Sequence, residues 1–157
     1  MLLPRGAAIA MGCCCAALHG MVALETAATL PPETLGRIVG VKSIRETRAG
    51  QLCDGRVSFL AVPADDAGAE SGSVEFQSPC VASAEGTWQV DETTQMLRWR
   101  LEYDRSSVFY SAPLDAFAAP QKSNRVKGDV LAAPRLEPEA MRKVGSFDLT
   151  LRSRCHK

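Results

Sequence analysis

Histidine is nearly absent from this sequence, whose 157 residues include only His19 and His156. A serine or cysteine nucleophile needs a base held beside it, and that base is usually histidine. A zinc site needs clustered cysteines and histidines, but the chain contains no Cys-x-x-Cys pair. We therefore expect no catalytic residues of this kind, no metal site and no cofactor.

The sequence also lacks an excess of either charge, with 18 basic and 18 acidic residues. A nucleic-acid partner, which a strongly basic domain would indicate, is therefore not expected. No glycine-rich phosphate loop is present, since residues 68–72 include no lysine. An enzyme that used carboxylates alone would need a buried acid, for which Asp129, Asp148 and Glu102 are the candidates.

The first 28 residues differ from the rest of the chain in being largely apolar. The first acidic residue is Glu25, and Thr26-Ala27-Ala28 supplies the small residues that a signal peptidase reads. We interpret residues 1–28 as a secretory signal peptide. A membrane anchor is the alternative, because residues 6–24 are just long enough to span a bilayer and would bring the protein into membrane contact. Both interpretations predict an extracytoplasmic protein that is secreted, periplasmic or in an organelle lumen.

Three strands are predicted between Gly86 and Ala112, where apolar and polar residues alternate at period two. In the first hairpin this alternation places Trp88 opposite Trp99. In the second hairpin it places Tyr103 opposite Val108, with a four-residue loop at 104–107. The bulky residues predicted to face inward are Trp88, Leu97, Trp99, Leu101, Tyr110, Phe147 and Leu149.

The remaining chain has short apolar runs between Gly and Pro residues and no long helical periodicity. We divide it into a linker at residues 29–37, either a spacer or one helical turn, and a single β domain at residues 38–157. Further strands are expected at residues 38–45, 56–62, 73–76, 125–131 and 144–152, and Gly128 indicates a bulge or a close backbone approach. The predicted fold class is all-β: an antiparallel meander of seven to eight strands that forms a small barrel or sandwich.

Three cysteines follow the N-terminal segment. In a hairpin that pairs Val57 with Phe76, Cys53 falls opposite Cys80 on the same face of the open end. We therefore predict a Cys53–Cys80 disulfide in an oxidising compartment, with two buried free thiols as the alternative. Cys155 is left as an unpaired thiol that could bond to a partner chain.

Gly86-Thr87-Trp88 resembles the Gly-x-Trp signature of lipocalins and related calycin barrels. In these barrels the tryptophan closes one end under an arginine of the last strand, and the resemblance gives that role to Arg152 or Arg154. The sequence departs from the pattern because Trp88 falls on about the third predicted strand, not the first, and no long helix follows the strands. We therefore do not assign the chain to this family.

Four arginines lie on the outward faces of two predicted strands and form a possible interaction face: Arg98, Arg100, Arg152 and Arg154. Since no catalytic group is found, we expect a non-catalytic β domain that contacts a protein partner as an accessory or interaction subunit, for example of a membrane-associated complex. The alternative is a lipocalin-like carrier that holds a small apolar ligand inside a barrel. The inward residues are bulky enough to fill that interior, which favours the first hypothesis.

Overall fold

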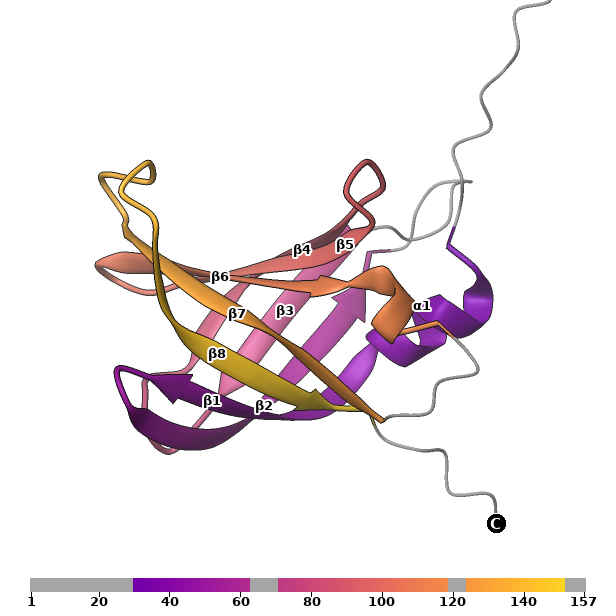
Figure 1. Ribbon diagram of the computed structural model, residues 1–157, viewed down its shortest axis with the longest axis horizontal. Coiled ribbons are helices and arrows are strands. Elements are labelled where there is room, and N and C mark those ends of the chain that lie inside the picture. The colour runs from indigo at the N-terminus through magenta and orange to yellow at the C-terminus, as the bar shows by residue number, and fades with distance from the viewer. Residues whose placement is uncertain (1–29, 63–70, 119–123, 152–157) are drawn as a thin grey trace, which may run out of the picture.

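The computed structural model describes residues 30–62, 71–118 and 124–151, which form a closed antiparallel barrel (Figure 1). The strands follow one another around the barrel in chain order, and the first described strand pairs with the last. This arrangement confirms the predicted all-β meander and distinguishes the barrel from the sandwich. The strands are β1 (Gly40–Arg48), β2 (Gln51–Ala61), β3 (Ser71–Gln77), β4 (Ala84–Asp91), β5 (Met96–Glu102), β6 (Ser106–Pro113), β7 (Arg125–Pro134) and β8 (Arg142–Thr150).

Two of the predicted hairpin registers are confirmed. Trp88 lies opposite Trp99 across β4 and β5. Val57 lies opposite Phe76 across β2 and β3. In both hairpins one face is apolar, so a slip by one residue would turn that face towards water.

The register predicted for β5 and β6 is wrong by two residues. Leu101, and not Tyr103, lies opposite Val108. The chain turns more tightly than the four-residue loop that we expected, because the Tyr103 N–H donates to the Ser106 carbonyl over 2.9 Å. Residues 104 and 105 alone separate these two ends of the turn.

The seam between β1 and β8 closes the barrel and lengthens β1. Pairing runs from Ser43 opposite Thr150 to Arg48 opposite Gly145, so β1 extends past the predicted end at residue 45. β7 is also longer than predicted and reaches Pro134. Its register with β8 shifts after Val130, so the bulge does not lie at Gly128. The alternative, a close backbone approach at Gly128, is confirmed, because a Cβ there would lie 2.2 Å from the Ser111 carbonyl oxygen.

A short helix, α1 (Pro32–Ile38), covers one end of the barrel (Figure 1). Proline is favourable in the first helical turn because its missing N–H has no partner there anyway. Thr34 and Ile38 are buried, with Ile38 fully inaccessible to solvent. The stretch predicted as a linker at residues 29–37 therefore contains a helix that packs as part of the domain. The 3₁₀ helix η1 (Leu114–Ala116) lies at the same end, with Leu114 buried.

Aromatic rings fill the middle of the barrel. Trp99 stacks on Tyr110 with ring centres 4.9 Å apart and planes 3° from parallel. Phe59 and Phe147 meet Trp99 edge-on at 5.3 and 5.0 Å, and Trp88 meets Phe59 in the same way at 6.5 Å. Every residue predicted to face inward is at most 3% exposed, so the predicted core is confirmed.

Trp88 lies on β4, and its side chain extends across the neighbouring strand β3. Its indole N–H donates to the Leu60 carbonyl of β2 over 2.9 Å. This crossing requires glycine at position 72, because a Cβ on Gly72 would overlap both the Leu60 carbonyl and the indole. The arginines that the lipocalin pattern would place over this tryptophan, Arg152 and Arg154, lie outside the described residues.

A disulfide joins Cys53 of β2 to Cys80 in the segment between β3 and β4, with Cα atoms 6.1 Å apart. The predicted pairing is confirmed, and the bond indicates an oxidising environment. No helix within the described residues is both long and apolar enough to cross a membrane. The predicted signal or anchor at residues 1–28 and the thiol of Cys155 lie outside the described residues.

Candidate functional site

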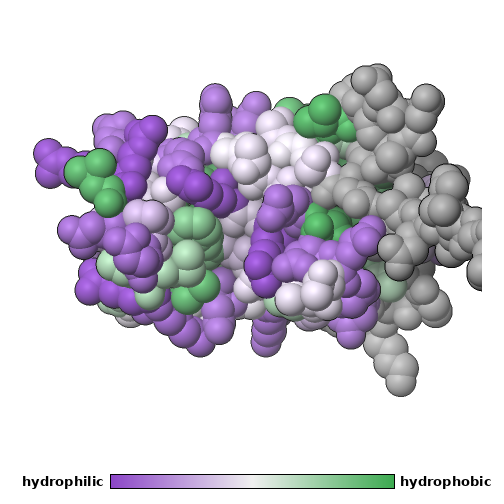
Figure 2. Space-filling view, turned by 90° about the horizontal axis from the view of Figure 1, so that it is seen from above, coloured by the Kyte–Doolittle hydropathy of each residue, from purple (hydrophilic) through white to green (hydrophobic). Residues whose placement is uncertain are grey.

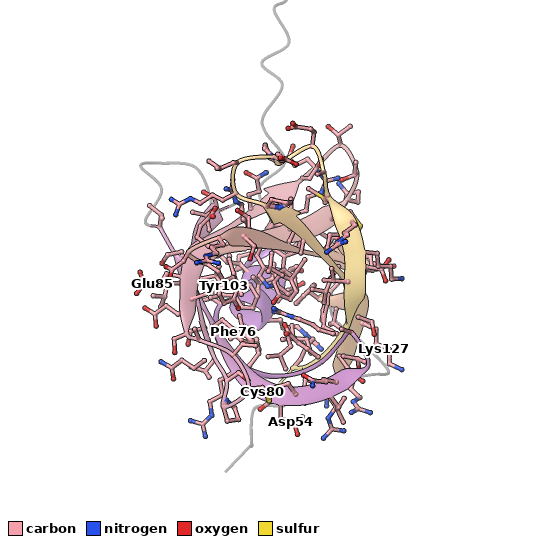
Figure 3. All side chains as sticks on the ribbon, turned by 90° about the vertical axis from the view of Figure 1, so that its left-hand side faces the viewer. Asp54, Phe76, Cys80, Glu85, Tyr103 and Lys127 are labelled. Atoms are coloured by element: carbon pink, nitrogen blue, oxygen red, sulfur yellow. A yellow bond between two sulfur atoms is a disulfide. The ribbon has the colours of Figure 1, made fainter. Side chains whose placement is uncertain are left out.

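The barrel end opposite α1 is open. Figure 3 looks into this open end, which is bordered by the β1–β2 turn, the segment 78–83 and the β5–β6 turn. Two hollows of about 430 and 280 Å³ lie there and share Arg48 and Val81 in their walls. The disulfide lines the smaller hollow, and Tyr103 lines the larger one. The two hollows therefore lie at the end of the barrel where the inner faces of the strands reach solvent.

An ion pair lies inside the barrel at this open end. Glu46 and Arg48 are two residues apart on β1, so both side chains occupy its inner face. Glu46 is 2% exposed, and its Oε2 lies 2.8 Å from Nη2 of Arg48. The same Nη2 donates to the Tyr110 hydroxyl over 2.5 Å. We call Glu46, Arg48, Tyr103 and Tyr110 the polar cluster.

The rings of the polar cluster flank its guanidinium. The central guanidinium carbon of Arg48 lies 5.9 Å from the ring centre of Tyr103 and 5.9 Å from that of Tyr110. Burial opposes the charged form of Arg48, but Tyr110, Glu46 and Tyr103 outweigh it and raise the pKa of the guanidinium. Arg48 therefore remains a cation at the base of the hollows.

Burial also keeps the two phenols of the polar cluster neutral. Desolvation raises the pKa of Tyr110 well above its usual value, the charge of Glu46 adds to the rise, and Arg48 opposes it. Desolvation likewise raises the pKa of Tyr103, again against Arg48. Both hydroxyls therefore keep their protons at neutral pH and can donate as well as accept hydrogen bonds.

The polar cluster is not fully satisfied by its own hydrogen bonds. Within the described structure, Oε1 of Glu46 and Nε of Arg48 are buried without a hydrogen-bond partner, while the Tyr103 hydroxyl lies within hydrogen-bonding reach of Arg48. A buried unpaired polar atom costs about 1–3 kcal/mol, and folded proteins contain few of them. The cluster thus has an unused acceptor on Glu46 and an unused donor on Arg48, with the Tyr103 hydroxyl beside them.

Sequence reasoning missed Glu46 and Arg48. The predicted first strand ended at residue 45, which left both residues in a turn. Because charged side chains occupy alternate inner positions of β1, its burial does not follow the apolar alternation that identified the other strands. The sequence pattern that could have indicated this pair is an acidic and a basic residue two positions apart. The same pattern is also typical of solvent-exposed strands, so it does not identify a buried pair.

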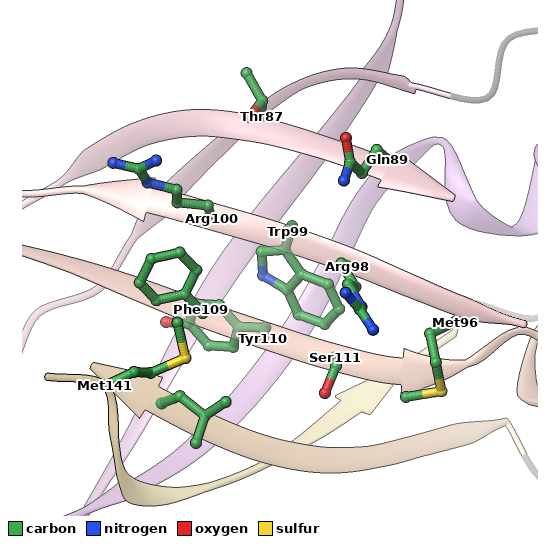
Figure 4. Close-up of a pocket in the computed structure, with 11 residues that line it drawn as sticks. Thr87, Gln89, Met96, Arg98, Trp99, Arg100, Phe109, Tyr110, Ser111 and Met141 are labelled. Carbon is green, nitrogen blue, oxygen red and sulfur yellow. The ribbon is translucent and has the colours of Figure 1, made fainter. Parts of the chain in front are cut away.

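A third hollow, of about 650 Å³, lies on the outside of β4 to β7 (Figure 4). Met96, Phe109, Leu131 and Met141 line it together with Arg98 and Arg100, two members of the predicted interaction face. Figure 2 shows this side of the barrel as mostly hydrophilic, with separate hydrophobic patches. We call this the outer hollow.

Both of these arginines have partners on neighbouring residues. Arg98 pairs with Asp91 at 3.2 Å, and Arg100 pairs with Glu102 and donates to Ser107 over 3.1 Å. β5, which carries the two arginines, is separated from β8 by β6 and β7. The other two members of the predicted face, at positions 152 and 154, follow β8 and lie outside the described residues.

None of the three acids proposed for carboxylate catalysis is the most buried carboxylate of the described structure. Asp129 pairs with Lys143 at 2.6 Å and is 54% exposed, while Asp148 lies 3.3 Å from Arg125. Glu102 is 34% exposed in its pair with Arg100. The deeply buried carboxylate is Glu46. No group of three or more His, Cys, Asp or Glu side chains in the described ranges is placed to hold a metal ion.

Comparisons with known proteins support the fold. No protein-family model matches the sequence, and no curated protein matches it. The structure is similar to that of a redesigned beta barrel, with a TM-score of 0.53 and 15% sequence identity over 80% of this chain and 100% of the other. At this identity the likeness shows the barrel fold alone.

Proposed function

We propose that this protein is a non-catalytic, extracytoplasmic binding barrel that takes a small molecule at its open end. The observation that carries the proposal is the polar cluster, a buried ion pair with unused hydrogen-bonding groups beside two open hollows. The larger hollow, about 430 Å³, falls within the range of about 300–1,000 Å³ that is usual for small-ligand sites.

Stability alone is a poor explanation for the polar cluster. Removing two charges from water costs several kcal/mol per ion, and apolar side chains in their place are often neutral or stabilising. The unpartnered atoms of Glu46 and Arg48 add to that cost. A few polar groups in a concave site commonly fix the orientation of a ligand. A ligand that bonds to these atoms would remove part of the cost.

The aromatic core limits how deep such a ligand can lie. Trp99, Tyr110 and Phe147 are at most 3% exposed and pack on one another across the middle of the barrel. A carrier that encloses a long apolar ligand would need this space. The proposed ligand therefore lies above the aromatic layer, against Arg48 and Tyr103.

The outer hollow favours a second candidate function, contact with a protein partner as an accessory subunit. Its wall combines flexible methionines, one of which, Met141, is 43% exposed, with Phe109 and two arginines. Such mixed surfaces are common at protein interfaces. A native complex that is lost on Arg98→Glu but retained by variants of the polar cluster would favour this function.

The disulfide and the interpretation of residues 1–28 as a signal or anchor both support an extracytoplasmic location. Secretion as a free protein and attachment to a membrane-associated complex are the two forms of this proposal. Intact mass of the protein from its native host distinguishes a cleaved signal from a retained anchor, because removal of residues 1–28 shortens the chain.

The binding proposal is tested by extracting the protein from its native host and identifying bound small molecules by mass spectrometry. Arg48→Lys keeps a cation beside Glu46 but loses the planar set of donors, so we expect it to lose the ligand. Arg100→Lys is the matched control on the outer face and should retain it. The proposal is wrong if the wild-type protein carries no small molecule or if both variants retain it equally.

A further inference from the structure

We infer that the ligand of the open end is an uncharged small molecule whose polar group both donates and accepts hydrogen bonds, as a carboxamide does. This inference rests on the proposed function and adds the chemistry of the ligand. It follows from the charges and the unused atoms of the polar cluster.

The unused atoms of the polar cluster define complementary roles. Oε1 of Glu46 needs a donor, and Nε of Arg48 needs an acceptor. The Tyr103 hydroxyl can take either role. Glu46 and Arg48 both line the smaller hollow, and Tyr103 lines the larger one beside Arg48, so a group in the smaller hollow faces both charged side chains. A carboxamide has an N–H donor and a carbonyl acceptor on the same carbon atom.

The charge balance of the ion pair disfavours a charged ligand. The cation of Arg48 is already neutralised by Glu46 at 2.8 Å. A carboxylate that approached Arg48 would bring a second anion next to Glu46, and an ammonium group would approach Arg48 itself. Like charges in a buried site repel strongly, which is a common basis of selectivity. A neutral group meets neither penalty.

The surroundings of the polar cluster suit a small ligand with a short apolar part. Val81 and Val108 line the larger hollow, and Leu52 with the disulfide lines the smaller one. Charged residues of both signs also line the larger hollow: Glu102, Asp104 and Arg105. The hollow therefore offers apolar contacts around a neutral polar base.

The test titrates the full domain with three probes of equal chain length: hexanamide, hexanoate and hexylamine. Binding is followed by two-dimensional ¹H–¹⁵N NMR, in which the side-chain Nε–H of Arg48 gives its own signal. We expect hexanamide to shift this signal and to bind about tenfold or more tightly than either charged probe. The inference is overturned if a charged probe binds as tightly, if hexanamide leaves the Arg48 signal unchanged, or if hexanamide does not bind.

Removal of one charge should weaken the discrimination against hexanoate. Glu46→Gln keeps an acceptor for Arg48 but removes the negative charge, so hexanoate should then bind about tenfold or more tightly than it binds the wild-type protein. Asp54→Asn removes an exposed carboxylate that pairs with Arg45 outside the barrel, and it should leave the order of the probes unchanged. Equal effects of the two substitutions on hexanoate would contradict the inference.

A second variant allows the test to succeed or fail even if the Glu46→Gln variant does not fold. Tyr103→Phe retains the ring beside Arg48 and removes only the hydroxyl, so it should fold and bind hexanamide about fivefold more weakly. An unchanged affinity would contradict the role of that hydroxyl. Preference for a charged probe overturns only the ligand chemistry, whereas a native protein that carries no small molecule also overturns the proposed function.

Discussion

Loss of the Cys53–Cys80 disulfide should destabilise the barrel by a calculable amount. The bond joins residues 27 positions apart. Closing a loop of this length removes about 3.5 kcal/mol of conformational entropy from the unfolded chain at 25 °C, in the chain-entropy treatment. Packing adds little, because Cys80 is exposed and Cys53 only half-buried. Replacing both cysteines by alanine therefore isolates the effect of the cross-link.

The assay is equilibrium unfolding in urea for the wild-type protein, Cys80→Ala and the double alanine variant. With a urea dependence of about 1.5 kcal/mol per molar, the unfolding midpoint should fall by about 2 M. The single and double variants should unfold together, because the bond is absent from both. A loss below about 1 kcal/mol in the double variant would refute the reasoning and show that the unfolded chain is already compact in this region.

Two further predictions concern buried contacts. Gly72→Ala should cost about 1–3 kcal/mol of unfolding free energy, because its Cβ would overlap the Leu60 carbonyl and the Trp88 indole. Gly36→Ala in α1 meets no atom within 4 Å and should instead stabilise by up to about 1 kcal/mol; similar urea curves for the two variants would contradict this. Burial raises the pKa of Tyr110, so the folded protein keeps a proton that the unfolded chain loses above about pH 10. The contribution of Tyr110 to the free energy of unfolding should be fully present below that pH and decrease above it. In urea unfolding measured at pH 9 to 11, the Tyr110→Phe variant should therefore lose less stability with rising pH than the wild-type protein.

The strands could be predicted because one face of most of them is apolar. Alternation at period two identified the inner residues Trp88 and Trp99 and their register. It failed for Tyr103 and Val108, since a slip by two residues leaves every side chain on the same face. The β5–β6 register was decided by the tight turn closed by the hydrogen bond between Tyr103 and Ser106, and no glycine or asparagine marks that turn in the sequence.

The candidate site was not predictable in the same way. Lys42, Glu46 and Arg48 occupy inner positions of β1 and Ile44 is the apolar residue among them, so hydrophobic alternation only weakly indicates which face is buried. Their burial depends on the pairing of β1 with β8, which are distant in the sequence. Arg98 and Arg100 were correctly placed on the outside of β5, but their pairing with Asp91 and Glu102 required the three-dimensional arrangement.

The seam between β1 and β8 determines when the open end of the barrel is complete. A ribosome delivers β1 first and β8 last among these strands, so the intervening hairpins can form while β1 still lacks one neighbour. Residues 145–150 complete the wall beside Glu46 and Arg48. The open end is therefore incomplete in the nascent chain until β8 is paired, and the proposed ligand would stabilise only the finished barrel.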